Sequence, residues 1–220
     1  MDTLTRATRS PDLPTVCRSC EARHGGVCSA LTAAQLMELS KHSSRRTIDA
    51  GSEFIGQGES VSSYSNILRG VVKLSKVMAD GRQQIVGLQF APDFMGRPFF
   101  EQSRMAAEAA TDTEICVFPR RAIERLIAET PELEHLLHSQ ALKELDDARD
   151  WMLTLGRKTA QEKVASFLSL IAGHGDPEAE DRSVFELPLS RADIADFLGL
   201  TNRHVTVPDL ARLAAAAGND

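Results

Sequence analysis

The sequence predicts an α+β protein, in which an N-terminal β-roll is followed by a long helix and a C-terminal helix-turn-helix. Short runs rich in Val, Ile and Leu, separated by glycines, fill residues 48–118, which is typical of antiparallel strands. Residues 131–156 repeat apolar residues at the spacing of an amphipathic helix. The stretch "LPLSRADIADFLGLT" has the N-cap, the apolar face and the glycine turn of a helix that bends into a second one.

Length and composition are those of a globular protein. The 220 residues suffice for one large domain or two small ones, and 42% hydrophobic and 25% charged residues are ordinary values. There is no apolar run long enough for a membrane span, and residues 1–16 lack the apolar core of a secretory signal. The net charge of −6 does not by itself favour nucleic acid, although a local basic face would still allow it. We therefore expect a cytoplasmic protein without membrane contact, whose thiols stay reduced.

The stretch "CRSCEARHGGVC" near the N-terminus holds three of the four cysteines. Cys17 and Cys20 have the C-x2-C spacing at which a tight turn directs two thiolates at one metal, and Cys28 follows after two glycines. The fourth thiol, Cys116, lies in the strand-like run "TEICVF", so a four-thiolate site requires the N-terminal segment to pack on the roll. Such a site suits zinc or an iron–sulfur cluster. His24 is an alternative ligand, and four unrelated reduced thiols are the remaining interpretation.

A short helix and then the roll are expected to follow the cysteines. In "LTAAQLMELSKHS", Thr32 and Gln35 have the spacing of a capping box at the start of an amphipathic helix. The roll is expected over residues 48–118. Its clearest turn is "ADGR", residues 79–82, because Asp-Gly between two strand-like runs is typical of a hairpin.

The long helix is predicted to form a dimer. A short helix is expected over residues 119–130, and Pro131 suits the first turn of the longer one. The predicted seam follows alternating spacings of four and three residues: Ala141, Leu145, Ala148, Met152 and Leu155. The alternative is a helix packed only on its own domain. Beside the seam lies an acidic group, which is either a solvated face or tunes dimerisation by like-charge repulsion: Glu144, Asp146, Asp147 and Asp150.

The C-terminal part is predicted to bind DNA. The stretch "KTAQEKVASFLSLIAGHG" is an amphipathic helix, residues 174–183 are a polar loop, and Ser190 caps a further helix that ends at Gly199. The candidate DNA-contacting residues are Ser190, Arg191, Thr201 and Arg203. An ordinary helical hairpin is the alternative.

The cysteine run, the roll, the long helix and the helix-turn-helix follow one another in an order that resembles the FNR group of transcription regulators in the CRP superfamily. Within that group they resemble the FnrL and FnrN branch. The resemblance covers essentially the whole chain and rests on "CRSCEARHGGVC", "DGRQQIVGLQFAPDFMGRP", "ATDTEICVF", "LDDARDWMLTLGRKTAQEKVASFL" and "LPLSRADIADFLGLT". It implies a cyclic-nucleotide-binding-like β-roll, a long dimerisation helix and a winged helix-turn-helix. The corresponding domains are a cluster-binding segment at 1–30, the roll at 31–130, the dimerisation helix at 131–157 and the DNA-binding domain at 158–220.

The resemblance also implies an oxygen sensor that regulates transcription. In the family an oxygen-labile [4Fe–4S] cluster, bound by four cysteines, favours a homodimer that binds a palindromic DNA operator. Carried over to this chain, the ligands are Cys17, Cys20, Cys28 and Cys116. The turn of Asp80, Gly81 and Arg82 then lies in the region that touches RNA polymerase. Cyclic nucleotide is not expected, because "DFMGRPFFEQSRMAAEAATD" lacks the Gly-Glu and Arg-Ser arrangement that holds its phosphate in relatives.

The resemblance breaks off after Thr201. Relatives continue with a recognition helix carrying Glu-x-x-Ser-Arg and with a two-stranded wing, whereas this chain continues with "NRHVTVPDLARLAAAAGND". Pro208 would stop a helix after about two turns, while "RHVTV" and "PDLARLAAAAG" look like the last wing strand and the closing helix. We therefore expect a segment of roughly 20 residues to be absent between Thr201 and Asn202. Without it, the chain is not expected to read a specific operator.

Two other functions compete with a cluster-dependent regulator. One is a zinc-based or thiol-based redox regulator of the same fold, and the other is a cluster-bearing dimerisation module that does not bind DNA. An enzyme is not expected, because the sequence shows no nucleophile–base pairing and no phosphate-binding glycine loop.

Overall fold

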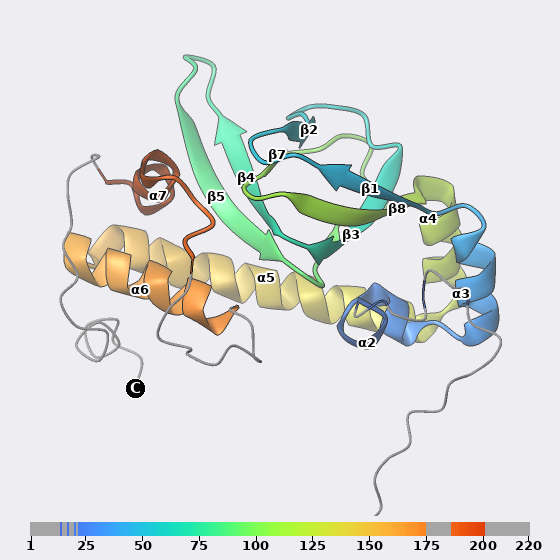
Figure 1. Ribbon diagram of the computed structural model, residues 1–220. Helices are drawn as coiled ribbons and strands as arrows, with labels where there is room; N and C mark the ends of the chain where they lie inside the picture. The colour runs from blue at the N-terminus through green and yellow to red at the C-terminus, as the bar shows by residue number, and fades with distance from the viewer. Residues whose placement is uncertain (1–13, 15–16, 18–19, 21, 175–185, 201–220) are drawn as a thin grey trace, which may run out of the picture.

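The computed structural model describes Pro14, Cys17, Cys20 and residues 22–174 and 186–200. The candidate DNA contacts Thr201 and Arg203, the expected wing and the position of the expected deletion lie outside the described residues. Within them a β-roll is flanked by helices (Figure 1), so the predicted α+β fold class is confirmed. None of the helices in this part of the chain combines the length and the apolar character needed to span a membrane.

In the described part of the chain, the roll consists of two four-stranded antiparallel sheets. The strands are β1 Ser44–Ile48, β2 Glu53–Ile55, β3 Ser63–Arg69, β4 Val71–Val77, β5 Gln83–Phe90, β6 Phe94–Met95, β7 Ala106–Ala109 and β8 Thr113–Pro119. Their order is β1-β8-β3-β6 in the first sheet and β2-β7-β4-β5 in the second. The predicted hairpin joins β4 to β5, and its Gly81 has a φ of 85°, a left-handed conformation that favours glycine.

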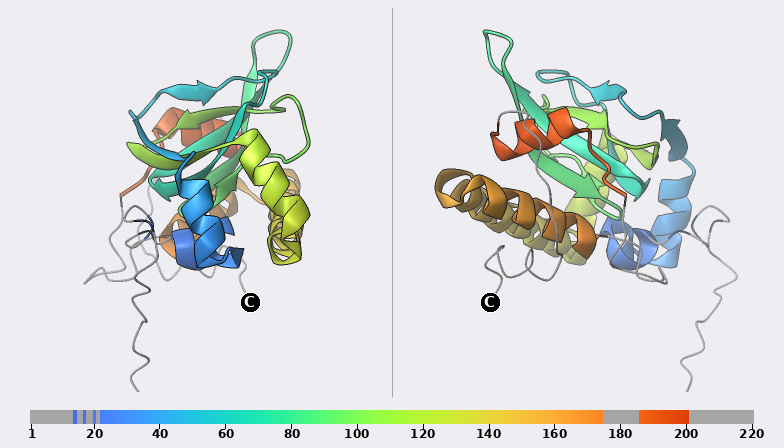
Figure 2. Two further views of the ribbon diagram at one scale, coloured as in Figure 1. Left: turned by 90° about the vertical axis from the view of Figure 1, so that its right-hand side faces the viewer. Right: turned by 60° about the vertical axis from the view of Figure 1, so that its left-hand side comes forward.

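Helices lie below the roll and at both of its ends in the view of Figure 1. They are α2 Ala22–Gly25, the 3₁₀ helix η1 Val27–Ala30, α3 Ala33–Ser40, α4 Arg120–Glu129, α5 Pro131–Arg157, α6 Ala160–Gly173 and α7 Arg191–Leu198. Capping boxes at Thr32, Thr159 and Ser190 begin α3, α6 and α7. Gly199 ends α7 in the left-handed conformation, and the helix therefore stops at the glycine where the sequence predicts its end. The views of Figures 1 and 2 show α5 running along the roll, with α6 beside its C-terminal part.

Groups of buried apolar side chains hold these parts together. One fills the roll around Ile67. A second joins the N-terminal arm, which we define as Cys17, Cys20 and residues 22–30, to α4 and the start of α5 through Val27 and Leu133. A third joins β5 to α6 and α7 around Phe167 and Leu198.

The first sheet has two faces with different surroundings. Because successive side chains of a strand point to opposite sides, Ile115 and Val117 of β8 face the interior of the roll, while Cys116 faces the arm and α3. On β3, Ser65 faces inward and Asn66 outward in the same way. We call these the inner face and the outer face.

Candidate functional site

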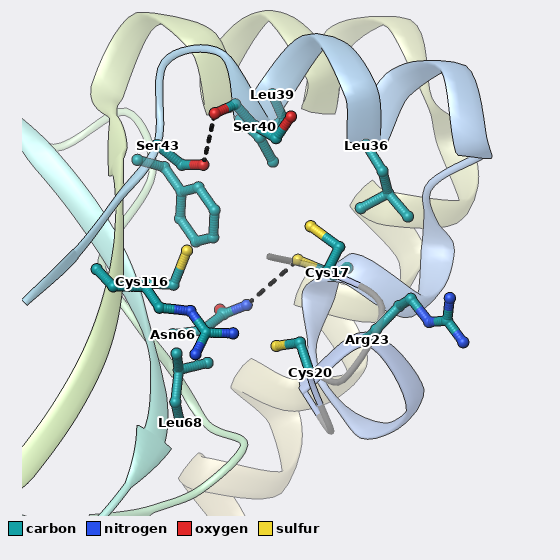
Figure 3. A pocket seen from close by; sticks show the side chains of 13 residues that line it. Cys17, Cys20, Arg23, Leu36, Leu39, Ser40, Ser43, Asn66, Leu68 and Cys116 are labelled. Atoms are coloured by element: carbon teal, nitrogen blue, oxygen red, sulfur yellow. Dashed lines mark hydrogen bonds between the residues drawn. The ribbon is translucent and has the colours of Figure 1, made fainter. Parts of the chain in front are cut away.

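Four thiols line one cavity between the N-terminal arm and the outer face of the first sheet. Cys17, Cys20 and Cys28 come from the arm and Cys116 comes from β8, so the structure brings together the four cysteines that the sequence singled out. Figure 3 shows Cys17, Cys20 and Cys116 around a common space. The cavity has a volume of about 20 Å³, roughly the room of one water molecule.

Apolar contacts of the arm place Cys28 against the sheet. Val27, the residue before it, is 2% exposed and belongs to the same buried group as Leu133 of α5. Full burial of a valine contributes roughly 1.5–3 kcal/mol. The arm also approaches the roll closely at Gly25, where a Cβ would lie 3.0 Å from the Cγ of Pro92. A larger residue at position 25 would therefore crowd Pro92, so that either the arm or the turn between β5 and β6 has to shift.

Asn66 borders the cavity from the sheet. It lies on β3 directly opposite Cys116 of β8, so both side chains stand on the outer face. The side chain is fully buried, and its Nδ2 donates a hydrogen bond to the Sγ of Cys28 at 3.5 Å. Its Oδ1 has no hydrogen-bond partner among the described residues. On the other side of Cys116, strand pairing with β1 places Arg45 next to it.

Burial makes Cys17, Cys28 and Cys116 hard to ionise. Burial raises the pKa of Cys28 to about 12 and the pKa of Cys116 to about 11, and negative charge on the neighbouring cysteines adds to both shifts. The hydrogen bond from Asn66 opposes the shift at Cys28, and Arg45 opposes it at Cys116. Burial also raises the pKa of Cys17. These thiols are therefore protonated at neutral pH, and a bound metal has to displace their protons.

The donor set fits a thiolate-bound metal centre. Apart from the thiols, the described residues that line the cavity are apolar, hydroxyl, amide or arginine side chains, so no carboxylate competes as a ligand there. Arg23 and Arg45 offset the negative charge that four thiolates would bring. His24, the alternative ligand, is exposed and contacts Arg23 instead. Among the described residues, no three His, Cys, Asp or Glu side chains lie close enough together to share one metal ion.

The predicted dimer seam lies on an exposed part of α5. Residues 141–150 are all exposed, so the described part of the chain does not cover this stretch. In the seam, Leu145 is 46% and Met152 is 72% exposed, whereas Leu155 is half-buried. Two further apolar residues that the spacing did not include are exposed as well: Leu142 and Leu153. The exposed apolar stripe is therefore wider than the predicted one.

The predicted polymerase contact forms the tip of the β4–β5 hairpin. The Nη2 of Arg82 lies 2.8 Å from the Oδ2 of Asp80, and the backbone N–H of Arg82 donates to the Oδ1 of Asp80 at 3.1 Å. Hydrogen bonds from Arg82 hold the pKa of Asp80 below its usual range. Together with the left-handed Gly81, these bonds fix the shape of an exposed turn.

The candidate DNA contacts Ser190 and Arg191 lie at the start of α7, and α7 is tied to the second sheet. The Nζ of Lys73 on β4 lies 2.9 Å from the Oδ1 of Asp193 on α7 and 2.8 Å from the Oε1 of Glu108 on β7. Burial alone would lower the pKa of Lys73, but its two carboxylate partners raise it, so this ammonium stays charged at neutral pH. The first helix of the expected helix-turn-helix is thus held against the roll.

A larger cavity of about 460 Å³ lies on the inner face of the first sheet, between the roll and α5. Ser65 and Ile115 line it from the sheet, Arg46 and Arg97 contribute positive charge, and Ala141 borders it from α5. This is the interior of the roll, where the sequence predicts that cyclic nucleotide is not bound, and that prediction stays open to test.

The sequence reasoning did not single out Asn66 or Lys73. Both are polar residues within strand runs rich in apolar residues, "YSNIL" and "VVKLS". Since a buried polar group is unfavourable unless it is satisfied by a partner, a polar interruption of a buried strand is the signal that points to such residues.

The chain has relatives among bacterial transcription regulators. Residues 45–130 match the family model of the cyclic nucleotide-binding domain. A protein of Rhizobium leguminosarum bv. viciae named "Probable transcriptional activator" is 60% identical over 221 aligned positions, which include 91% of this chain and 92% of that protein. The "Transcriptional activator protein FnrL" of Cereibacter sphaeroides is 36% identical, over 95% of this chain and 96% of that protein.

A solved structure agrees with these relatives. FixK2 from Bradyrhizobium japonicum superposes with a TM-score of 0.66 at 30% identity, covering 80% of this chain and 83% of that one. Identity of this level over nearly the whole chain, together with the matching roll, shows that the chain belongs to the CRP/FNR family of transcription regulators.

Proposed function

We propose that this chain is an oxygen-responsive transcription regulator, which acts on DNA as a homodimer when its four cysteines hold a [4Fe–4S] cluster. The observation that carries the proposal is the cavity that Cys17, Cys20, Cys28 and Cys116 line together. Membership of a family whose relatives are named transcriptional activators supports the regulatory part. The cluster would supply a redox centre that oxygen destroys. The chain would bind the cluster and link its state to α5.

The arm connects the thiols to α5. Cys28 lies in η1 beside Val27, which shares a buried group with Leu133 in the first turn of α5. Burial raises the pKa of Cys28 and Cys116, so these two thiols are neutral unless a metal binds them. A change at the thiols acts on the arm that carries them, and close packing transmits such a change to the start of α5. The exposed stripe that would form the dimer lies further along the same helix.

We also propose that this chain lacks part of the DNA-reading unit. The alignment with the Rhizobium leguminosarum protein spans 221 positions but includes 91% of the 220 residues of this chain, about 200, so about 20 positions have no counterpart here. This number equals the length of the segment that the sequence predicts to be absent between Thr201 and Asn202. Without a recognition helix, the remaining residues contact phosphate but do not distinguish bases.

Metal analysis of protein made and purified without oxygen tests the cluster. We expect iron and sulfide in the amounts of one [4Fe–4S] cluster per chain, and broad absorbance from the violet into the visible range that bleaches in air. Stoichiometric zinc without iron or sulfide would overturn the proposal and indicate a zinc-based regulator instead.

A binding titration tests DNA reading separately. The cluster-loaded chain is expected to bind a palindromic duplex of the family type and a scrambled duplex with similarly weak affinity. Insertion of roughly 20 residues with the Glu-x-x-Ser-Arg pattern after Thr201 is expected to restore preference for the palindrome. Tight and selective binding by the unaltered chain would contradict the deletion, and a repaired chain without preference would contradict the DNA-binding function.

A further inference from the structure

Asn66 is a buried polar residue that the stability of the fold does not explain. It is 0% exposed and lies between Cys116 of β8 and Phe94 of β6 in the first sheet. Its Oδ1 has no hydrogen-bond partner in the described part of the chain. Leaving a buried acceptor unpaired costs about 1–3 kcal/mol, a cost that Leu at this position would avoid. The other half of the amide, Nδ2, points to the Sγ of Cys28 at 3.5 Å.

We propose that Asn66 is a positioning residue of the cluster site, whose Nδ2–H group donates a hydrogen bond to the Cys28 sulfur and thereby sets how readily the cluster is oxidised. This inference rests on the proposed function. A donor to a ligand sulfur stabilises negative charge on that sulfur, so it favours the reduced cluster over the oxidised one. Removing the donor makes loss of an electron easier.

The location of Asn66 distinguishes it from the charged groups near the thiols. Arg45 also borders the cavity, but its side chain is exposed and lies 3.0 Å from the carboxylate of Glu114. Water and the ion pair weaken its field at the sulfurs. The Asn66 amide is buried, where a hydrogen bond is electrostatically stronger. Because an amide does not titrate, its effect on the cluster is expected to be the same throughout the neutral pH range.

Replacement of Asn66 by Leu is the main test. Asn66→Leu keeps a similar volume and removes the donor together with the unpaired Oδ1, so stability is expected to stay equal or to increase. In protein loaded without oxygen, we expect wild-type iron and sulfide content, a more negative midpoint potential, and severalfold faster bleaching in air. A role that is merely structural would leave the potential unchanged.

Thr113→Val is the matched control, because it also makes a fully buried polar residue of the first sheet apolar. The Thr113 hydroxyl donates to the carbonyl of Thr111 at 2.7 Å, and the residue does not line the cysteine cavity. This variant is expected to lose stability but to keep the wild-type midpoint potential and bleaching rate. A potential that shifts in both variants would assign the effect to general loosening of the sheet and overturn the role of Asn66.

The wild-type protein gives a second measurement, which needs no variant to fold. The chain has three asparagines, Asn66, Asn202 and Asn219. After selective ¹⁵N labelling of asparagine and reduction of the cluster to its paramagnetic state, pulsed EPR is expected to detect a ¹⁵N coupling. If the wild type takes up no iron and sulfide, the proposed function itself fails. If it binds the cluster but shows no ¹⁵N coupling, or if Asn66→Leu keeps the wild-type potential, the role of Asn66 fails while the proposed function stands.

Discussion

The two faces of the first sheet carry different chemistry on the same strands. The inner face borders a cavity of about 460 Å³, in the region that matches a nucleotide-binding family, and the outer face borders the cavity of about 20 Å³ between the four thiols. Along β8 the sides alternate residue by residue, with Ile115 and Val117 inside and Cys116 outside. Residues on the outer face can therefore change to form a cysteine site without altering the side chains that line the inner cavity of the same strands.

Both cavities reach α5, but at different points. The inner cavity borders α5 directly at Ala141 and Glu144, whereas the outer one reaches it through Val27 and the buried Leu133 near its start. The predicted dimer seam follows on the exposed surface of the same helix. The proposed regulation would therefore run from the thiols to α5 through the packing of the arm, whereas the interior of the roll borders α5 directly.

The largest expected effect is the loss of the cluster in Cys116→Ser. A site with four ligands loses its coordination when one thiolate is removed, so protein made without oxygen is expected to contain almost no iron or sulfide, as in Cys20→Ser. The control is the inward-facing neighbour: Ile115→Val is expected to cost about 0.5–1.5 kcal/mol in the free energy of unfolding and to keep its iron. Full iron content in Cys116→Ser would remove this residue from the ligand set, and lost iron in Ile115→Val would break the separation of the two faces.

A second variant separates assembly from cluster binding. Leu145→Glu places two like charges against each other across the two-fold axis of the proposed dimer, far from the cysteine cavity. We expect the dissociation constant of the dimer to rise on the order of 100-fold or more, because an unpaired buried charge costs several kcal/mol. Sedimentation velocity measures the change, and iron analysis is expected to show an intact cluster. A variant that remains fully dimeric would place the seam elsewhere.

The smallest expected effect concerns the second sheet, whose side chains are also divided between an inner and an outer face. In β4 the side chains of Val72 and Leu74 face the interior of the roll, while Lys73 faces α7. Lys73→Met leaves two carboxylates without their cation, and we expect the free energy of unfolding to fall by about 1–3 kcal/mol. Lys76→Met, at the exposed end of the same strand, is the control and should change stability by less than about 0.5 kcal/mol. Urea denaturation distinguishes the two, and equal effects would contradict the role of the ion pair.

The features that were predictable from the sequence depend on neighbours along the chain. The capping box at Thr32, the Asp-Gly hairpin and the glycine turn after α7 follow from local backbone preferences, and the structure contains all three. The cysteines could be grouped because the chain has only four of them. Such signals need no knowledge of what packs against what.

The features that were not predictable depend on contacts between distant segments. The exposed stripe of α5 differs from the predicted spacing. The Trp151 ring packs against α7, with its centroid 4.5 Å from that of Phe197. Further along α5, Leu155 is half-buried and Leu153 is exposed. Asn66 could not be assigned to the cysteine site, because its position opposite Cys116 depends on the register between β3 and β8.

Sedimentation of one cluster-loaded sample, before and after exposure to air, tests most directly whether the outer face controls assembly. We expect a dimer before exposure and a monomer afterwards, with the change in step with the bleaching of the visible absorbance. Cys116→Ser is expected to be monomeric under both conditions. A wild-type protein that stays dimeric after its absorbance has bleached would contradict the link between the four thiols and α5.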